Sequence, residues 1–151
     1  MGLDMYLTKK YYVKNWKHTK DEDRHEITIK KGGKDSSIPA DKIREIIIDV
    51  FYWRKANQIH KWFVDNVQGG EDECKESYVE RDQLQELLTT VKAVLQDHSQ
   101  AKILLPTQSG FFFGSTEYDN YYYEDLKATE KGLEEALKED DGGDFYYHSS
   151  W

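Results

Sequence analysis

The chain has 151 residues, with 21 basic and 29 acidic side chains that give a net charge of −8. This length suits a single domain, 1–151, that buries its own core, and an aromatic content of 14% argues against disorder. Most of the acidity lies in residues 101–151, which carry a net charge of −7, so we do not expect direct binding of nucleic acid. The single cysteine, Cys74, excludes an intramolecular disulfide.

The first half of the chain predicts two strands and one long helix. Alternating apolar residues predict a strand over 3–13 and a second strand over 25–31. Apolar side chains then recur at spacings of three and four across 41–68, which predicts one amphipathic helix. Glycines at 69 and 70 are expected to end it.

The second half predicts two further helices and two strands. A short strand is expected at 77–80, a helix over 82–97, an irregular segment over 101–118 and a third helix over 119–139. The aromatic C-terminal segment predicts a last strand, paired with the N-terminal one because it has no other place to bury its rings. The fold class expected is α+β, a small and mainly antiparallel sheet packed by about three helices.

Tyrosines and carboxylates cluster at the start of the predicted third helix. Only Tyr122 fits the buried stripe with Leu126, so several of the other rings should be exposed. Tyrosine is enriched in binding surfaces, although carboxylates are also favoured at a helix N-terminus by the helix dipole. We interpret the cluster, which also holds Asp125, as a partner-binding surface. Its candidate residues are Glu117, Tyr118, Asp119, Tyr121, Tyr123 and Glu124.

A second hypothesis is a pocket for a small, nucleotide-like ligand between the long helix and the loop 107–115. Glycines let a loop backbone approach a ligand closely, a base could stack on an aromatic ring, and a cation such as Arg54 would meet phosphate. The alternative interpretation of Asn57 and His60 is a buried, hydrogen-bonded pair that fixes the helix register. The candidate ligand-binding residues are Trp53, Arg54, Asn57, His60, Thr107, Gln108, Ser109, Phe112 and Ser115.

No motif indicates catalysis or metal binding. The five histidines show no HxxxH or HExxH spacing, and nothing in the sequence pairs Cys74 with a histidine base. We therefore predict no catalytic residue, no metal and no cofactor, and the sequence favours a binding function over an enzymatic one. No secretory signal and no membrane-spanning segment are expected.

Four segments resemble a family of small proteins encoded by bacteriophages and prophages. They are MGLDMYL at the N-terminus, YWRKANQIH at 52–60, LLPTQSGFFFGS at 104–115 and YYHSSW at the C-terminus. The family carries no catalytic residues over to this chain. The resemblance implies a phage accessory protein in the bacterial cytoplasm that binds a host protein and blocks a host enzyme or a defence system. We expect the partner to have a basic surface, and in one variant the carboxylates stand in for the phosphates of a nucleic acid.

Overall fold

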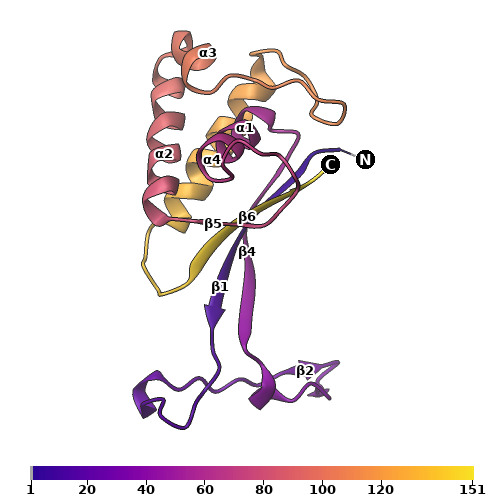
Figure 1. The fold of residues 1–151 in the computed structure, drawn as a ribbon, viewed down its shortest axis with the longest axis vertical. Coiled ribbons are helices and arrows are strands. Elements are labelled where there is room, and N and C mark those ends of the chain that lie inside the picture. The colour runs from indigo at the N-terminus through magenta and orange to yellow at the C-terminus, as the bar shows by residue number, and fades with distance from the viewer. Residues whose placement is uncertain (1) are drawn as a thin grey trace.

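The computed structural model describes residues 2–151, which form a four-stranded antiparallel sheet with helices packed against one of its faces (Figure 1). The strand order is β4-β1-β6-β5, so the first strand lies beside the last one. This arrangement confirms the predicted α+β class and the predicted pairing of the terminal strands. The strands of this sheet are β1 (Asp4–Tyr12), β4 (Glu45–Arg54), β5 (Ser77–Val79) and β6 (Asp144–Ser150).

Two of the helices begin at clear capping residues. The side chains of Glu80 and Gln83 each accept a hydrogen bond from the other residue's backbone N–H, which forms a capping box at the start of α2. The side chain of Asp119 accepts a hydrogen bond from the N–H of Tyr122 at 3.1 Å and begins α4. The helices are α1 (Asn57–Asn66), α2 (Arg81–Gln96), α3 (Ala101–Leu104) and α4 (Asn120–Ala136).

The core lies between the sheet and the helices. Phe63 of α1 stacks on Tyr147 of β6, with ring centroids 3.9 Å apart. The indole N–H of Trp53 in β4 donates to the hydroxyl of Thr129 in α4 at 2.7 Å. All four of these side chains are buried, so two helices are fixed to two different strands by large, well-matched contacts.

The predicted long helix over 41–68 is wrong. Residues 45–54 form strand β4, and within that range only α1 is an α-helix. The strand sequence EIIIDVFYWR is rich in β-branched and aromatic residues, which fit a pleated surface, and β1 offers it a partner along its whole length. A run in which most residues are apolar matches a helical period and a strand period equally well, so its spacing could not decide between them.

The predicted strand over 25–31 is also wrong in its extent. Only β2 (Lys30–Lys31) is paired there, with β3 (Lys34–Asp35). Gly32 and Gly33 form the turn between them at φ angles of 60° and 79°, the left-handed conformation that tight hairpins require. Two short 3-10 helices flank this hairpin, η1 (Asp21–Asp23) and η2 (Ala40–Lys42).

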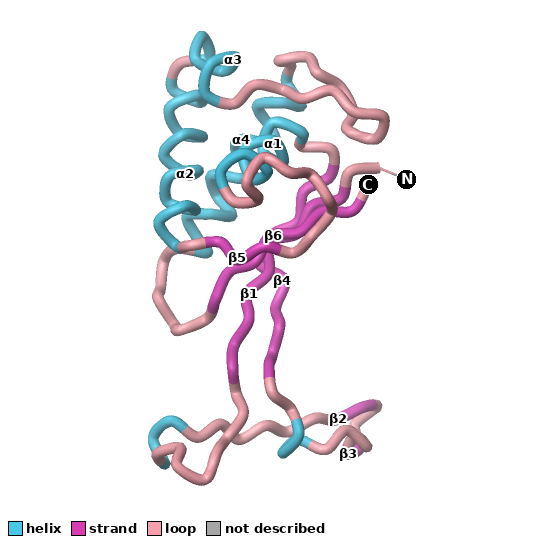
Figure 2. Tube along the Cα trace, viewed as in Figure 1, coloured by secondary structure: helices cyan, strands magenta, loops and turns pink. Residues whose placement is uncertain are grey.

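The chain divides in space into three parts (Figure 2). We call residues 13–44 the distal module, the neighbouring segments 9–12 and 45–49 the ribbon, and the remainder the body. β1 and β4 continue past the last pair that β1 makes with β6, and so carry the distal module away from the body. The distal module has nine basic and six acidic side chains, a net charge of +3, whereas the body has a net charge of −11 and the ribbon is neutral.

Candidate functional site

One buried side chain holds the loop after α3 against the start of α1. The Nδ2 atom of Asn57 donates to the carbonyl oxygens of Phe113 and Ser115, both at 2.9 Å. Its Oδ1 atom accepts a hydrogen bond from the N–H of Gln108 at 3.0 Å. The structure therefore brings Asn57 to the loop 107–115, as the sequence suggested, but the amide is engaged in shaping that loop.

His60 and Trp53 are also occupied by contacts within the protein. The Nδ1 atom of His60 lies 2.6 Å from the hydroxyl of Tyr147, and its Nε2 atom lies 2.8 Å from a carboxylate oxygen of Asp72. His60 is 0% and Trp53 4% exposed, so neither ring presents a face on which a ligand could stack. The protein's own side chains therefore fill the space of the proposed pocket around these rings. The hydrogen bonds of His60 follow the general rule that buried polar groups are satisfied internally.

Two tyrosines of the predicted partner-binding surface are partly buried by structural contacts. The hydroxyl of Tyr118 accepts a hydrogen bond from the N–H of Thr107 at 3.1 Å, which ties the two ends of the loop together. Tyr123 stacks on His98, with ring centroids 3.8 Å apart. Their neighbour Tyr122 is buried, and this burial raises the pKa of its hydroxyl.

The other members of that surface are open to solvent. Tyr121 is 82% exposed, and the side chains of Glu117 and Asp119 are exposed beside it along the chain. Glu124 is exposed and pairs with Lys127 at 3.0 Å. From here on, the acidic tyrosine surface means the four open residues Glu117, Asp119, Tyr121 and Glu124.

A cleft of about 290 Å³ joins the two sets of candidate residues. It opens where the end of β4, the start of α1, the loop after α3 and the start of α4 meet. Its lining includes Arg54, Thr107 and Ser115 of the predicted ligand site. It also includes Glu117, Asp119 and Tyr121 of the predicted partner surface. The two predicted sites are thus neighbours in space although β4 and α4 are far apart in the sequence.

Asp125 gives the cleft a carboxyl that titrates close to neutrality. Burial raises the pKa of Asp125 to about 6, the charge of Asp119 adds to this rise, and a hydrogen bond with Gln58 opposes it. Arg54 and Lys55 line the same cleft, and within residues 2–151 neither has a carboxylate partner within 4.0 Å. The cleft therefore holds charges of both signs that remain free to meet another molecule.

The backbone at the mouth of the cleft is strained. Lys55 has a φ angle of 57°, in the left-handed region that few residues other than glycine adopt. Its N–H donates to the carbonyl oxygen of Leu3 at 2.7 Å, which holds it in this conformation. Gly114 packs directly on it, since a Cβ atom at Gly114 would lie 3.2 Å from the Cβ of Lys55. Backbone strain of this kind is found preferentially at functional sites.

The rest of the loop contributes little to the cleft. Ser109 is exposed, and Phe112 is partly buried while its carbonyl oxygen accepts a hydrogen bond from the N–H of Leu3 at 3.0 Å. Phe111, which we had not selected, is 94% exposed. Gln58, which lines the cleft, was not predicted from the sequence, and Asp125 was expected on the open patch. The available signal was that Asp125 directly precedes Leu126, on the edge of the stripe that α4 buries.

Comparisons with protein-family models, with curated protein sequences and with solved structures give no match to this chain. No helix within residues 2–151 combines the length and the apolar composition needed to cross a membrane. Over the same residues, no three His, Cys, Asp or Glu side chains gather in a way that could hold a metal ion. The assignment of a function therefore rests on the geometry of the cleft and of the surface around it.

Proposed function

We propose that this chain is a non-enzymatic binding protein that engages a basic surface of a partner protein through the acidic tyrosine surface. The observation that carries the proposal is Tyr121, a large ring that is 82% exposed at the edge of the cleft. Carboxylates of Glu117, Asp119 and Asp125 line the same cleft. A rigid aromatic ring beside carboxylates suits an anchor for a partner's arginine or lysine side chain.

The charge distribution supports this proposal. The body carries a net charge of −11, most of it in residues 101–151, and such a field speeds encounter with a basic partner. On the resemblance to phage and prophage proteins, the partner is a bacterial host protein in the cytoplasm, and binding blocks a host enzyme or a defence system. Neither a membrane nor a nucleic acid is the direct partner in this proposal.

A second candidate function is the binding of a small anion. Arg54 and Lys55 support it, because both line the cleft without a carboxylate partner among residues 2–151. The cleft volume of about 290 Å³ lies just below the range of roughly 300–1,000 Å³ for ligand pockets. It therefore suits a phosphate-sized group better than a whole nucleotide.

The test is a charge reversal with a matched control. Glu117→Lys with Glu124→Lys should reduce the rate of association with a partner captured from bacterial lysate by about tenfold or more, since these changes reverse the local field. Glu73→Lys with Glu86→Lys makes the same change in net charge on the loop before β5 and on α2, and should have a smaller effect. Tyr121→Ala should raise the dissociation rate. Equal effects of the two charge-reversed variants would contradict the proposed surface.

The second candidate predicts the opposite pattern. If the cleft binds an anion, Arg54→Ala should abolish the heat of binding of inorganic phosphate in calorimetry, whereas Glu117→Lys should preserve or strengthen it. Absence of phosphate binding to the unmodified protein would remove this candidate and leave the first one standing.

A further inference from the structure

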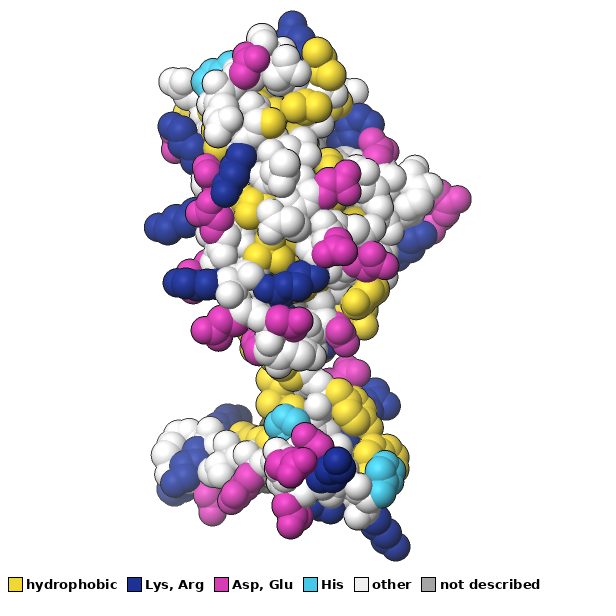
Figure 3. All heavy atoms as spheres, turned by 90° about the vertical axis from the view of Figure 1, so that its left-hand side faces the viewer, with side chains coloured by type: hydrophobic (Ala, Val, Ile, Leu, Met, Phe, Trp, Pro, Cys, Tyr) yellow, Lys and Arg dark blue, Asp and Glu magenta, His cyan; other side chains and the backbone are white. Residues whose placement is uncertain are grey.

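The ribbon exposes an apolar strand that has no partner on its outer edge. Ile46, Ile47 and Ile48 of β4 are 38%, 55% and 41% exposed, and apolar side chains gather at the narrow waist above the distal module (Figure 3). β4 is an edge strand, and within residues 2–151 its backbone forms hydrogen bonds with β1 alone. A long apolar edge of this kind is normally covered, because it is a template for pairing with another strand.

A β-bulge in β4 determines which side chains share a face. Leu7 pairs with Phe51 and Thr8 pairs with Asp49, so Val50 is an extra residue in the middle of the strand. Alternation on the two sides of this bulge assigns the strand residues to two faces. Ile46, Ile48, Phe51 and Trp53 lie on the face that the helices cover, and Glu45, Ile47, Asp49, Tyr52 and Arg54 lie on the other face.

We propose that β4 pairs in antiparallel fashion with β4 of a second copy of this chain, about a two-fold axis between Asp49 and Val50. In this register, residues that oppose one another across the two copies lie on the same face of the joined sheet. The bulge of each copy makes this possible, because it lies at the axis and shifts the alternation of side chains by one residue. Every apolar residue of β4 except Val50, which stands opposite Asp49, then meets an apolar residue. The opposed pairs are Ile46 with Trp53, Ile47 with Tyr52 and Ile48 with Phe51, each formed twice by symmetry.

Charge complementarity selects this register and this occupant. Glu45 of one copy lies opposite Arg54 of the other at both ends of the paired strands. The competing self-pairing, centred on Ile47, would place Glu45 opposite Asp49 twice, and like charges directly opposed destabilise a sheet. Outside the two Asp49–Val50 pairs at the axis, the residues of β4 thus complement themselves, which is the requirement for a symmetric interface.

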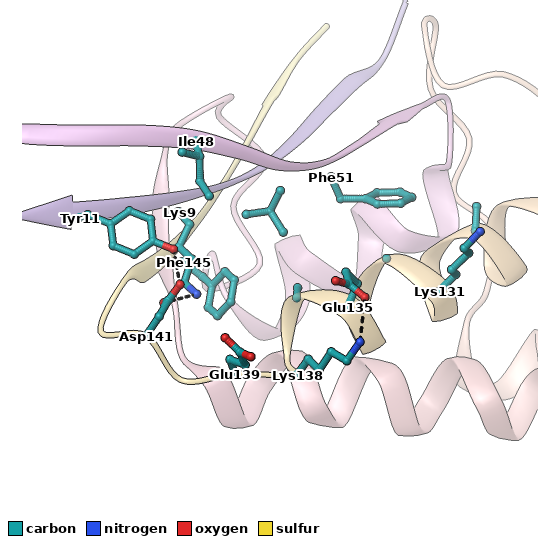
Figure 4. A pocket seen from close by; sticks show the side chains of 14 residues that line it. Lys9, Tyr11, Ile48, Phe51, Lys131, Glu135, Lys138, Glu139, Asp141 and Phe145 are labelled. Carbon is teal, nitrogen blue, oxygen red and sulfur yellow. Dashed lines mark hydrogen bonds and ion pairs between the residues drawn. The ribbon is translucent and has the colours of Figure 1, made fainter. Parts of the chain in front are cut away.

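A groove opens beside β4 on the face that would carry the Ile48–Phe51 pairs. It has a volume of about 670 Å³ and lies between β4 and the second half of α4 (Figure 4). Ile48, Val50 and Phe51 line it together with Gly132, where a Cβ atom would come within 2.2 Å of the Phe51 ring. Ile48 of the second copy stands opposite Phe51 on this face, so it would add to the apolar part of a lining that also includes charged residues such as Lys131 and Glu135.

The antiparallel arrangement also brings oppositely charged parts of the two copies together. The distal module of each copy runs beside the body of the other, because the two ribbons point in opposite directions. The distal module has a net charge of +3 and the body −11, so this placement is attractive on both sides of the axis. A dimer would therefore cover the ribbon, whose far end beyond Lys10 is only two strands wide and weak by itself.

The first test is the mass of the protein in solution. Sedimentation equilibrium at tens of micromolar should give twice the 17.8 kDa of one chain. Ile47→Lys should weaken association by tenfold or more without unfolding, since Ile47 is 55% exposed. The matched control is Tyr78→Lys, a residue of similar exposure (52%) on the opposite edge strand β5, and it should remain a dimer. A monomeric unmodified protein, or a dimer insensitive to Ile47→Lys, would overturn the proposal.

The second test addresses the register. Glu45→Arg and Arg54→Glu should each weaken the dimer severalfold, and the double swap should restore it. In a Cys74→Ser background, Ile47→Cys with Tyr52→Cys should form a disulfide between copies on oxidation, because these positions oppose one another only across the axis. Neither single cysteine should do so. If the double charge swap does not restore the dimer and the double cysteine variant does not cross-link, the proposed register is wrong. These readouts need no host partner, so their failure is distinct from failure of the proposed function.

Discussion

The body and the distal module are built by different means, although one continuous pair of strands joins them. The body contains every buried apolar side chain within residues 2–151 except Val13. The distal module is held by local polar contacts instead. Asn15 exchanges two hydrogen bonds with the backbone of His25, at 2.8 and 2.9 Å, and the Nζ atom of Lys14 lies 4.3 Å from the ring of Trp16.

This difference implies that the body supplies the stability of the protein, whereas the distal module and the ribbon supply surface for recognition. Cooperative folding requires buried apolar area, so the free energy of unfolding must come almost entirely from the body. The distal module and the ribbon add six exposed large hydrophobic residues and a charge opposite to that of the body. Those properties suit an interface rather than a core. If this separation holds, changes in the body should cost far more stability than changes in the distal module.

Deleting residues 145–151 should abolish cooperative folding. This deletion removes most of β6, which lies between β1 and β5, together with the buried rings of Phe145 and Tyr147. Burying each such ring contributes roughly 1.5–3 kcal/mol, and a whole domain is stable by only about 5–15 kcal/mol. Thermal melting followed by circular dichroism measures the effect. As a control, removal of Trp151 alone should leave a cooperative transition, and a similar transition in the full deletion would show that β6 is dispensable.

Asn57→Ala should destabilise the body by about 2–4 kcal/mol. The substitution removes three hydrogen bonds from a buried side chain and leaves backbone groups of the loop 107–115 unpaired, each at a cost of about 1–3 kcal/mol. Denaturant unfolding measures the loss of stability. Hydrogen exchange should show lost protection at Gln108, whose N–H bonds to Asn57. Asn15→Ala in the distal module removes a comparable polar contact and should change the stability of the body by less than about 0.5 kcal/mol.

Asp125→Asn should stabilise the protein at pH 7–8 and weaken its pH dependence. The pKa of Asp125 rises from 3.8 to about 6 on folding, so the folded state holds this proton more tightly than the unfolded state. The free energy of unfolding therefore decreases as the pH rises from about 4 to above 6. For a fully buried group, this pKa rise would lower the free energy of unfolding at high pH by about 3 kcal/mol. Partial solvation of Asp125 reduces the effect to about 1–2 kcal/mol.

Unfolding by urea at several pH values measures this effect. Glu124→Gln changes an exposed carboxyl next to Asp125 in the sequence and should leave the pH dependence unaltered. If Asp125→Asn leaves the slope between pH 4 and 7 unchanged, the carboxyl does not carry the raised pKa.

Replacing residues 14–43 by a short glycine-containing turn should have the smallest effect on stability. The body keeps its whole core, and β1 and β4 keep the pairs that lie within the body. We expect a cooperative transition within a few degrees of the parent. The dimer should weaken at the same time, because the basic distal module no longer lies beside the acidic body of the other copy. Loss of cooperative folding would show that the distal module supports the body.

Several parts of the candidate site could be predicted from the sequence. The pattern of polar residues placed Arg54, Asn57 and the loop 107–115 in one candidate pocket, but the hydrogen bonds that tie Asn57 to this loop were not predicted. The excess of tyrosines over positions on one helical face predicted several exposed rings, and of these only Tyr121 is exposed, because Tyr118 and Tyr123 are partly buried. The environment of Asp125 could not be predicted, because its pKa depends on burial and on a hydrogen bond with Gln58, which lies on a different helix.

The sequence by itself determined the features that depend on local pattern and composition. These are the α+β class, the positions of α2 and α4, and the pairing of the two terminal strands. Only the tertiary structure decided the secondary structure of residues 45–54. An apolar run fits a helix or a strand, and pairing with the neighbouring β1 favours the strand. It alone also revealed the cleft and the apolar edge of β4, because a cleft and an unpaired edge are properties of how distant segments pack and not of any one segment.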